Sequence, residues 1–330
     1  MSYALQISLM PFRKNELMKH IVMPALLFAL ACTGSPDHSP PELKENPSVP
    51  ETELEISDDN GSVIKLRGPA KRIASLAPSY TGILFDLGCG KNIVVRDVFS
   101  DYPSKALEIP STDGVNLSVE HILSFNPDLI LAFKSNPARL DAAQRTGIPV
   151  AVFKPGNMEE IFKTIRTLSS LCGKESAAAV VIESMKKRIK SVQNAVKGRK
   201  KPLVFVEVDG SDPNRPWTAG PGSFLDQIIS MAGGKNLAHD IEEEWGVITA
   251  EEVVRRNPDF IVLLMGTEST ARADTDRFRQ RPGWSGINAV KNGAVISDIP
   301  QAKLSRPGPE IMDGLEALAR KLHPEAFLQK

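Results

Sequence analysis

The sequence is short of several features that define whole classes of protein. Only three of its 330 residues are cysteine, so it is not one of the small secreted domains held together by disulfides. Neither sign of charge is in excess, because 40 Lys and Arg residues balance 40 Asp and Glu residues. A neutral chain has no basic field to attract phosphates, which argues against general nucleic-acid binding. With 42% hydrophobic residues the chain must fold around an ordinary core, and its length predicts about two domains.

Motifs for catalysis and for metal binding are also missing. The sequence contains no Gly-x-Ser-x-Gly elbow, no Gly-x-Gly-x-x-Gly fingerprint and no Gly-Lys-Ser/Thr phosphate loop. The glycine-containing stretch 218–223 precedes a helical pattern but matches neither phosphate-binding motif. His121, His239 and His323 lie far apart, without the spacing of metal ligands. We therefore expect a binding protein with no enzyme activity, no cofactor and no metal.

The N-terminal segment is typical of an exported protein. Its apolar run, Ile21–Ala31, follows Lys19 and is shorter than the roughly 20 residues of a membrane-spanning helix. The run leads into Ala29-Leu30-Ala31-Cys32, which resembles the lipobox at which bacterial lipoproteins are cleaved and acylated. We predict a signal peptide over residues 1–31, with Met18 as the favoured start, and a lipid anchor on Cys32. The alternative is an apolar N-terminal helix with a chance cysteine.

A proline-rich tether is predicted over residues 32–53. Five prolines lie among polar residues between Thr33 and Thr52, the composition of an extended linker. An anchored tether places the folded part outside the cytoplasm, in the periplasm or at the cell surface. In that setting Cys89 and Cys172 could pair, and both a disulfide and two thiols in the core fit the sequence. Core thiols are the prediction.

The rest of the chain predicts an α/β protein of two similar lobes. After a hairpin over 54–66, short apolar strands alternate with helical patterns as far as Leu171, and a second such set runs from Leu203 to Leu322. Between them, Glu175–Lys197 has apolar residues at three- and four-residue steps without Pro or Gly, which predicts one long helix. It would join the lobes, or else lie on the surface of one of them. We expect an N-terminal lobe at 54–174, a bridging helix at 175–198 and a C-terminal lobe at 199–330.

An internal repeat supports the relationship between the lobes. Leu117–Asp128 aligns with Ile248–Asp259, and both segments place a hydroxyl residue before a short helix and Asn-Pro-Asp after it. The hydroxyl is an expected N-cap and Asn-Pro is a stop signal, so the motif has a structural explanation. It also places a glutamate at the same position in each lobe, Glu120 in the first and Glu251 in the second.

Aromatic residues lie at the ends of several predicted strands, at the edge where open parallel sheets bind ligands. Tyr80, Tyr102 and Trp217 follow strands, and Phe133 ends one. Trp245 stands just before the repeated segment that contains Glu251. Any one of them could be a core residue. Taken together, they suggest a flat, apolar ligand bound between the lobes.

Together with several motifs, these residues resemble the cobalamin and iron-chelate solute-binding proteins of ABC importers, over roughly Leu54 to Leu322. The motifs are Arg72–Ser79, Ser100-Asp101-Tyr102-Pro103, both Asn-Pro-Asp sequences, Thr218–Phe224 and Arg306–Pro309. Ser-Asp-Tyr-Pro points to the cobalamin-binding branch. The resemblance implies two Rossmann-like lobes bridged by one long α-helix, the class III periplasmic binding protein type. It also implies a monomer that captures a corrinoid and delivers it to a dimeric membrane permease.

The resemblance also implies roles for particular residues. Tyr102 would contact the corrin, with Phe133, Trp217 and Trp245 as apolar walls, while Asp298 and Arg306 would make polar contacts with the ligand. Tyr80 is added because it follows the first strand.

Glu120 and Glu251 would dock against arginines of the permease, unless each simply complements the dipole of its helix. Some members of the family carry a tryptophan near the position of Ser111–Gly114, and this chain has none. The alternatives are a haem or ferric-siderophore receptor and, in another class, a metal-cluster enzyme subunit.

Overall fold

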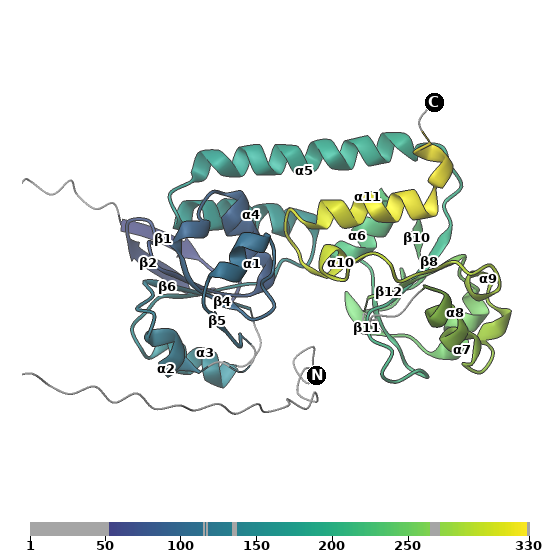
Figure 1. The fold of residues 1–330 in the computed structure, drawn as a ribbon, viewed down its shortest axis with the longest axis horizontal. Helices are drawn as coiled ribbons and strands as arrows, with labels where there is room; N and C mark the ends of the chain where they lie inside the picture. The colour runs from purple at the N-terminus through teal and green to yellow at the C-terminus, as the bar shows by residue number, and fades with distance from the viewer. Residues whose placement is uncertain (1–52, 115, 117, 134–136, 265–270, 329–330) are drawn as a thin grey trace, which may run out of the picture. The chain divides into compact units, whose positions relative to one another are not determined.

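The computed structural model describes residues 53–330 except 115, 117, 134–136, 265–270 and 329–330 (Figure 1). Glu53–Lys330 forms a compact unit of its own. The predicted signal peptide, Met18, Cys32 and nearly all of the tether lie outside the described residues.

The N-terminal lobe is built on a parallel sheet of five strands in the order β5-β4-β3-β6-β7. All residues of β3 and β7 are buried, as expected for strands with both faces covered. An antiparallel hairpin of β1 and β2 precedes this sheet, as its Asp-Asn-Gly turn signal predicts. The strands are β1 (Glu53–Ser57), β2 (Val63–Arg67), β3 (Ile73–Leu76), β4 (Ile93–Asp97), β5 (Ser111–Thr112), β6 (Leu129–Phe133) and β7 (Val150–Phe153). The helices are α1 (Pro78–Asp86), α2 (Val119–Leu123), α3 (Pro137–Gln144) and α4 (Met158–Leu171), with short 3-10 turns at Gly90–Asn92 and Ser104–Glu108.

The C-terminal lobe repeats this plan with a parallel sheet in the order β10-β8-β12-β13 and a separate antiparallel pair, β9 and β11. The strands are β8 (Leu203–Glu207), β9 (Trp217–Ala219), β10 (Lys235–Asn236), β11 (Trp245–Val247), β12 (Phe260–Leu263) and β13 (Val295–Ile296). The helices are α6 (Phe224–Met231), α7 (Ala250–Arg256), α8 (Ala271–Arg279), α9 (Asn288–Lys291), α10 (Ala302–Ser305) and α11 (Ile311–Leu322). Two 3-10 turns lie at Trp284–Gly286 and Pro324–Ala326. The α/β fold class expected from the sequence is therefore confirmed.

One long helix, α5 (Glu175–Ala195), joins the lobes. Its 21 residues span about 32 Å at the usual rise of 1.5 Å per residue. It packs on α4 of the first lobe and on α6 and α11 of the second, and Figure 1 shows it running above both. Its inward face carries the buried Ala178, Ile182, Met185 and Val192, at the three- and four-residue spacing that predicted it. The interpretation as a helix within one lobe is thus wrong.

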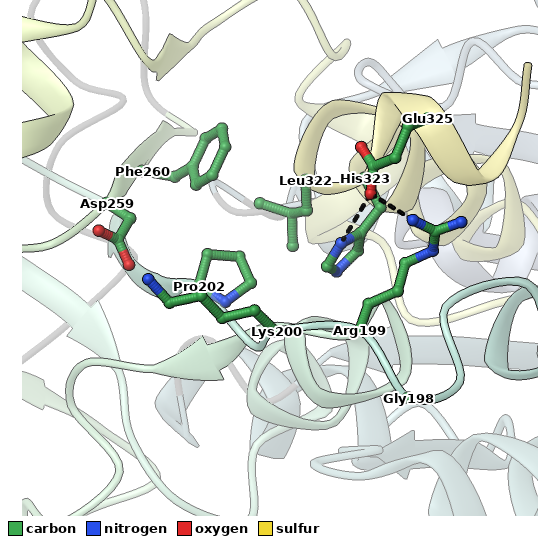
Figure 2. A pocket seen from close by; sticks show the side chains of 9 residues that line it. All are labelled: Gly198, Arg199, Lys200, Pro202, Asp259, Phe260, Leu322, His323 and Glu325. Atoms are coloured by element: carbon green, nitrogen blue, oxygen red, sulfur yellow. Dashed lines mark hydrogen bonds and ion pairs between the residues drawn. The ribbon is translucent and has the colours of Figure 1, made fainter.

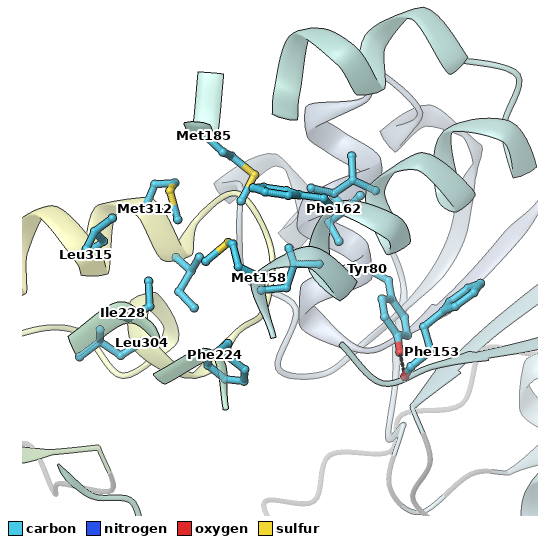
Figure 3. Close-up of a cluster of buried hydrophobic side chains, with 14 of the residues drawn as sticks. Tyr80, Phe153, Met158, Phe162, Met185, Phe224, Ile228, Leu304, Met312 and Leu315 are labelled. Atoms are coloured by element: carbon cyan, nitrogen blue, oxygen red, sulfur yellow. Dashed lines mark hydrogen bonds between the residues drawn. The ribbon is translucent and has the colours of Figure 1, made fainter. Parts of the chain in front are cut away.

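The largest group of buried apolar side chains is continuous between the two lobes. Figure 3 shows Met158 and Phe162 of α4 beside Met185 of α5, with Ile228 of α6 and Met312 of α11 on the other side. Because close-packed interiors resist sliding and opening, this shared core holds the lobes together beneath α5.

The sequence repeat corresponds to two equivalent structures. The Ser118 hydroxyl accepts from the His121 amide at 3.3 Å, and the Thr249 hydroxyl accepts from the Glu252 amide at 3.2 Å. Each helix is followed by an asparagine in the left-handed region, with φ 46° at position 126 and φ 51° at position 257. The aspartate after each Asn-Pro then accepts from the backbone of the neighbouring strand segment, as Asp259 does from Leu203 at 2.9 Å.

Cys89 and Cys172 form a disulfide across 83 residues of chain, with their Cα atoms 6.5 Å apart. Both residues are buried, so their predicted place in the core is right, but the prediction of free thiols is wrong. The first lies in the turn after α1 and the second caps α4. Only the packing of these two helices brings the cysteines together, and a disulfide suits an exported protein.

Candidate ligand-binding site

The carboxyl ends of the strands of one lobe face residues of the other. After β7, the carbonyl of Gly156 accepts from the Phe224 amide at 2.6 Å, and the Met158 amide donates to the Gln227 side chain at 2.8 Å. After β4, the segment that contains Asp101 meets the loop between α10 and α11. Both sheets therefore present their carboxyl edges toward the junction of the lobes, which is the usual place for ligands on open α/β sheets.

Tyr102 lies at this junction, half-buried, with a ring carbon facing Gly82 of α1. Burial raises the pKa of its phenol above the ordinary 10, and the neighbouring carboxylates Asp86, Asp313 and Glu310 raise it further. These acids come from both lobes, so the residue belongs to the surface where the lobes meet. Its hydroxyl is neutral at physiological pH and can serve as a hydrogen-bond donor.

Three apolar side chains of the N-terminal lobe are exposed at the carboxyl edge. Phe133 ends β6 with 44% of its surface exposed, while Val98 and Phe99 follow β4 with 43% and 45% exposed. Val98 and Phe99 are adjacent in the chain, and contiguous exposed apolar side chains mark binding surfaces more often than isolated ones do. Phe133 was expected from the sequence, whereas Val98 and Phe99 were missed. Their position directly before Ser-Asp-Tyr-Pro was the signal that could have identified them.

Two tryptophans lie on the small antiparallel sheet of the C-terminal lobe. Trp217 of β9 is paired with Val247 of β11, which is 41% exposed. Trp245 packs on Phe224 with the ring centroids 5.2 Å apart. Both indoles are half-buried against the core, and the indole nitrogen of Trp217 is buried without a hydrogen-bond partner in the described part of the chain. This sheet gives the second lobe an apolar surface of its own.

The two charged residues expected to contact a ligand are engaged elsewhere. Arg306 donates to the Asp101 carboxylate at 2.5 Å and to the carbonyl of Phe99 at 2.9 Å. Asp298 forms an ion pair with Lys321 in the last turn of α11. Arg306 thus joins the lobes, and Asp298 stabilises a contact inside the C-terminal lobe.

Tyr80 is a core residue, and its assignment as a ligand contact is wrong. It is fully buried in α1, and its hydroxyl donates to the carbonyl of Phe153 at 2.5 Å (Figure 3). Burial raises the pKa of this phenol strongly. Tyr80 lies in the first turn of α1, which directs its ring into the core against Phe153 of β7, with the ring centroids 6.1 Å apart.

Glu120 and Glu251 are exposed in the first turns of α2 and α7. Among the described residues, Glu120 accepts only a long hydrogen bond from Ser118, at 3.4 Å. The neighbouring Glu252 is bound by Arg255 and Arg256, whereas Glu251 has no ion-pair partner in the described part of the chain. The repeated acid is therefore the one that remains available in each lobe.

Two surface hollows lie away from these residues. One, of about 540 Å³, is at the amino ends of β8 and β12 (Figure 2). Its lining consists of Gly198, Arg199, Lys200, Pro202, Asp259, Phe260, Leu322, His323 and Glu325. The other, of about 420 Å³, lies between α4 and α5. Neither contains a residue expected to bind ligand. Within the described ranges there is no cluster of metal ligands, and no helix is long and apolar enough to cross a membrane.

The sequence profile of a family described as "Periplasmic binding protein" matches residues 73–302. This chain belongs to the periplasmic binding protein family. Members of the family bind solutes and are not enzymes, so the expectation of a non-enzyme is confirmed, and the metal-cluster enzyme subunit is excluded. The match spans both lobes and α5, which agrees with the observed fold.

Two relatives of this periplasmic binding protein match more than half of its sequence. The uncharacterized ABC transporter substrate-binding lipoprotein YvrC of Bacillus subtilis is 31% identical over 300 residues, which cover 88% of this chain and 92% of the relative. The vitamin B12-binding protein of Yersinia pestis is 30% identical over 205 residues, covering 61% of this chain and 71% of the relative.

Two solved structures superpose on most of this chain. A possible iron-binding solute-binding protein from Staphylococcus epidermidis superposes with a TM-score of 0.68 at 31% identity, over 77% of this chain and 99% of that one. The vitamin B12 binding protein BtuF of Vibrio cholerae superposes with a TM-score of 0.64 at 25% identity, over 79% of this chain and 99% of that one. The class III fold expected from the resemblance is thus confirmed.

Proposed function

We propose that this protein is an exported lipoprotein that captures cobalamin, or a related corrinoid, between its lobes and delivers it to an ABC permease. The observation that carries the proposal is the apolar character of both carboxyl edges. Val98, Phe99 and Phe133 on one lobe and Trp217 with Val247 on the other could enclose a large ring system. The names of the Yersinia and Vibrio relatives support this ligand class.

The charges at the junction also favour a ligand of low net charge. Arg306, the arginine expected to bind ligand, is already paired with Asp101 across the lobes. The nearby cations Arg188 and Lys303 are likewise paired with Asp313, so they offer little attraction to an anionic chelate. The raised pKa of Tyr102 disfavours the phenolate form that binds ferric iron.

An iron chelate, either haem or a ferric siderophore, is the second candidate. The name of the Staphylococcus epidermidis structure, which is 31% identical, supports it. Such a ligand would use Tyr102 as an oxygen donor to the metal instead of as a neutral hydrogen-bond donor.

Delivery would use the repeated acids and the predicted anchor. Glu120 and Glu251 lie at equivalent positions in the first turns of α2 and α7. Each lobe would thus present one carboxylate to one of the two equivalent subunits of the permease. Rim charges of this kind mainly steer association and set its register. Acylation of Cys32 would keep the receptor near the permease, and the description of YvrC as a lipoprotein supports this step.

The experiment that tests the proposal is a titration of Glu53–Lys330 with cyanocobalamin, haem and a ferric siderophore. Tryptophan fluorescence and calorimetry would follow binding. We expect saturable one-to-one binding of cyanocobalamin alone. Binding of haem or the siderophore without cyanocobalamin would overturn the corrinoid assignment while leaving the receptor role intact.

Two matched variants test the site itself. Phe99→Ala removes an exposed ring at the proposed site, and we expect it to weaken cyanocobalamin binding about tenfold, the value of burying a large apolar side chain. Val180→Ala truncates an exposed apolar side chain on α5 and should leave affinity unchanged. Equal effects of the two substitutions would contradict the location of the site.

A further inference from the structure

One segment of this neutral chain carries a local excess of positive charge. Between Ser184 and Val206 there are eight Lys and Arg residues and no Asp or Glu, although the whole chain has 40 of each sign. The segment comprises the second half of α5 and the loop that leads to β8. Blocks of like charge often take part in interactions.

Three of these eight cations have acidic partners. Lys186 pairs with Glu183 at 3.3 Å, Arg188 binds two acids of α11, and Arg199 pairs with Glu325 at 2.7 Å. The other five are exposed and have no ion-pair partner in the described part of the chain; they are Lys187, Lys190, Lys197, Lys200 and Lys201. We call these five residues the basic face.

The basic face points away from the interior. Lys187 and Lys190 lie on the side of α5 opposite the buried Met185 and Val192. Lys200 extends along the rim of the hollow at the amino end of β8 (Figure 2). Figure 1 shows α5 along one edge of the folded unit, whereas α2 and α7, which carry Glu120 and Glu251, lie at the opposite edge. The basic and the free acidic groups are thus on opposite sides.

We propose that the basic face binds the anionic phospholipid headgroups of the membrane to which the protein is anchored. Each lysine near an anionic bilayer strengthens binding by about fivefold, so several lysines together give substantial binding at low ionic strength. A lipid anchor and a polybasic patch are a common pair of membrane signals, and the predicted acylation of Cys32 would supply the other one.

A bilayer suits this surface better than a nucleic acid does. The exposed residues of the segment are lysine, arginine, serine, glutamine, asparagine and glycine, without an aromatic side chain on which a base could stack. The lysines carry point charges that need no fixed partner geometry, which is adequate for mobile headgroups.

The proposal has a consequence for delivery. When the basic face lies on the membrane, α2 and α7 point away from it. If the permease is contacted through Glu120 and Glu251, as proposed above, then membrane-bound and docked orientations exclude each other. The membrane-bound receptor is then a resting state that remains near the permease without occupying it.

Co-sedimentation of Glu53–Lys330 with lipid vesicles tests the inference. We expect binding to vesicles of phosphatidylcholine with phosphatidylglycerol at low ionic strength, little binding to phosphatidylcholine alone, and release by high salt. A variant with four lysines of the basic face replaced should bind these vesicles at least about tenfold more weakly, as measured by its vesicle–water partition coefficient. Its substitutions are Lys187→Gln, Lys190→Gln, Lys197→Gln and Lys200→Gln.

The matched control replaces four exposed lysines elsewhere with Gln: Lys91, Lys105, Lys235 and Lys291. It should bind as the unsubstituted protein does. Equal binding to both kinds of vesicle, or an equal loss in both variants, would overturn the proposal. Because no solute ligand is present, this failure would be distinct from a failure of the corrinoid titration.

Discussion

Arg306 of the C-terminal lobe binds Asp101 of the N-terminal lobe, with the guanidinium nitrogen 2.5 Å from the carboxylate oxygen. A second nitrogen of Arg306 donates to the carbonyl of Phe99 at 2.9 Å. One arginine therefore holds the strand-end segment that carries both Phe99 and Tyr102. The position of the proposed ligand site in one lobe depends on a side chain from the other.

We expect Arg306→Gln to lower both stability and ligand affinity. The Asp101 side chain is 58% exposed, so a double-mutant cycle with Asp101→Asn should give a coupling of about 1 kcal/mol or less in urea unfolding. Affinity should fall further, because the segment with Phe99 loses its anchor. As a control, Asp298→Asn breaks the ion pair with Lys321 inside one lobe and should leave affinity unchanged. If Arg306→Gln binds ligand normally, the contacts of Arg306 with Asp101 and Phe99 do not position the ligand site.

The two tyrosines of the N-terminal lobe should give opposite results. Tyr80→Phe leaves the buried carbonyl of Phe153 without its donor, so the free energy of unfolding should fall by about 1–3 kcal/mol. Ligand affinity of the folded variant should not change. Tyr102→Phe should barely affect unfolding but should weaken cyanocobalamin binding. Urea unfolding and calorimetric titration of both variants measure this contrast, and a loss of affinity in Tyr80→Phe alone would reverse our assignment.

A buried ion pair at the end of β8 should be important for stability. Glu207 is 1% exposed and accepts from Arg281 at 2.5 and 2.9 Å, while the guanidinium lies over the rings of Phe278 and Trp284 at 4.4 and 4.7 Å. Arg281→Ala would leave an uncompensated buried carboxylate, so we expect a loss of about 3–5 kcal/mol in urea unfolding.

The matched control for this ion pair is the exposed pair of Arg279 and Asp276, with each side chain 51% exposed. Arg279→Ala should cost less than about 1 kcal/mol, since solvent screens such pairs. Similar losses in Arg281→Ala and Arg279→Ala would mean that burial of the Glu207 carboxylate has little effect.

Asp86 should make stability depend on pH. Burial, and then the nearby Asp313, raise the pKa of its carboxyl from 3.8 to about 6. Because the folded protein disfavours the ionised form, stability falls as pH rises from 3.8 to about 6, and the penalty is complete above that range. Asp86→Asn should therefore be more stable than the unsubstituted protein at neutral pH, and equally stable below pH 3.8. The gain should be about 1 kcal/mol or less, because the side chain is only partly buried and solvent screens its charge.

Urea unfolding across this pH range measures the difference. Asp86 is also the last residue of α1, where a carboxylate opposes the helix dipole. A gain in Asp86→Asn that persists unchanged into acid would show that titration of this carboxyl is not the cause.

Replacing Glu120 and Glu251 with alanine should impair delivery without affecting capture. We expect the double variant to bind cyanocobalamin normally and to stimulate permease-dependent uptake less, with the remaining stimulation weakly dependent on salt. Alanine at the exposed acids Glu108 and Glu242 is the control for lost negative charge. Unchanged uptake with the Glu120 and Glu251 variant would rule out the docking role.

Local sequence patterns predicted the elements of this fold well. α5 begins at Glu175, as predicted, and ends at Ala195, close to the predicted Lys197. α7 lies between the hydroxyl of Thr249 and the Asn-Pro sequence that were expected to start and stop it. Such elements depend on spacing and capping within a few residues of chain, which can be read directly from the sequence. The same reasoning predicted the repeated asparagine turns of the two lobes.

Tertiary structure decided which side chains are available for binding. Tyr80 and Tyr102 look alike in the sequence, yet the first is fully buried and the second lies where the lobes meet. The partners of Arg306 and of Cys89 come from distant parts of the chain, and no local pattern indicated them. The sequence alone determined the elements and the two-lobed plan, because short-range backbone preferences and apolar periodicity specify them. Burial and charge pairing depend on contacts between segments far apart in the chain, so only the folded structure could assign them.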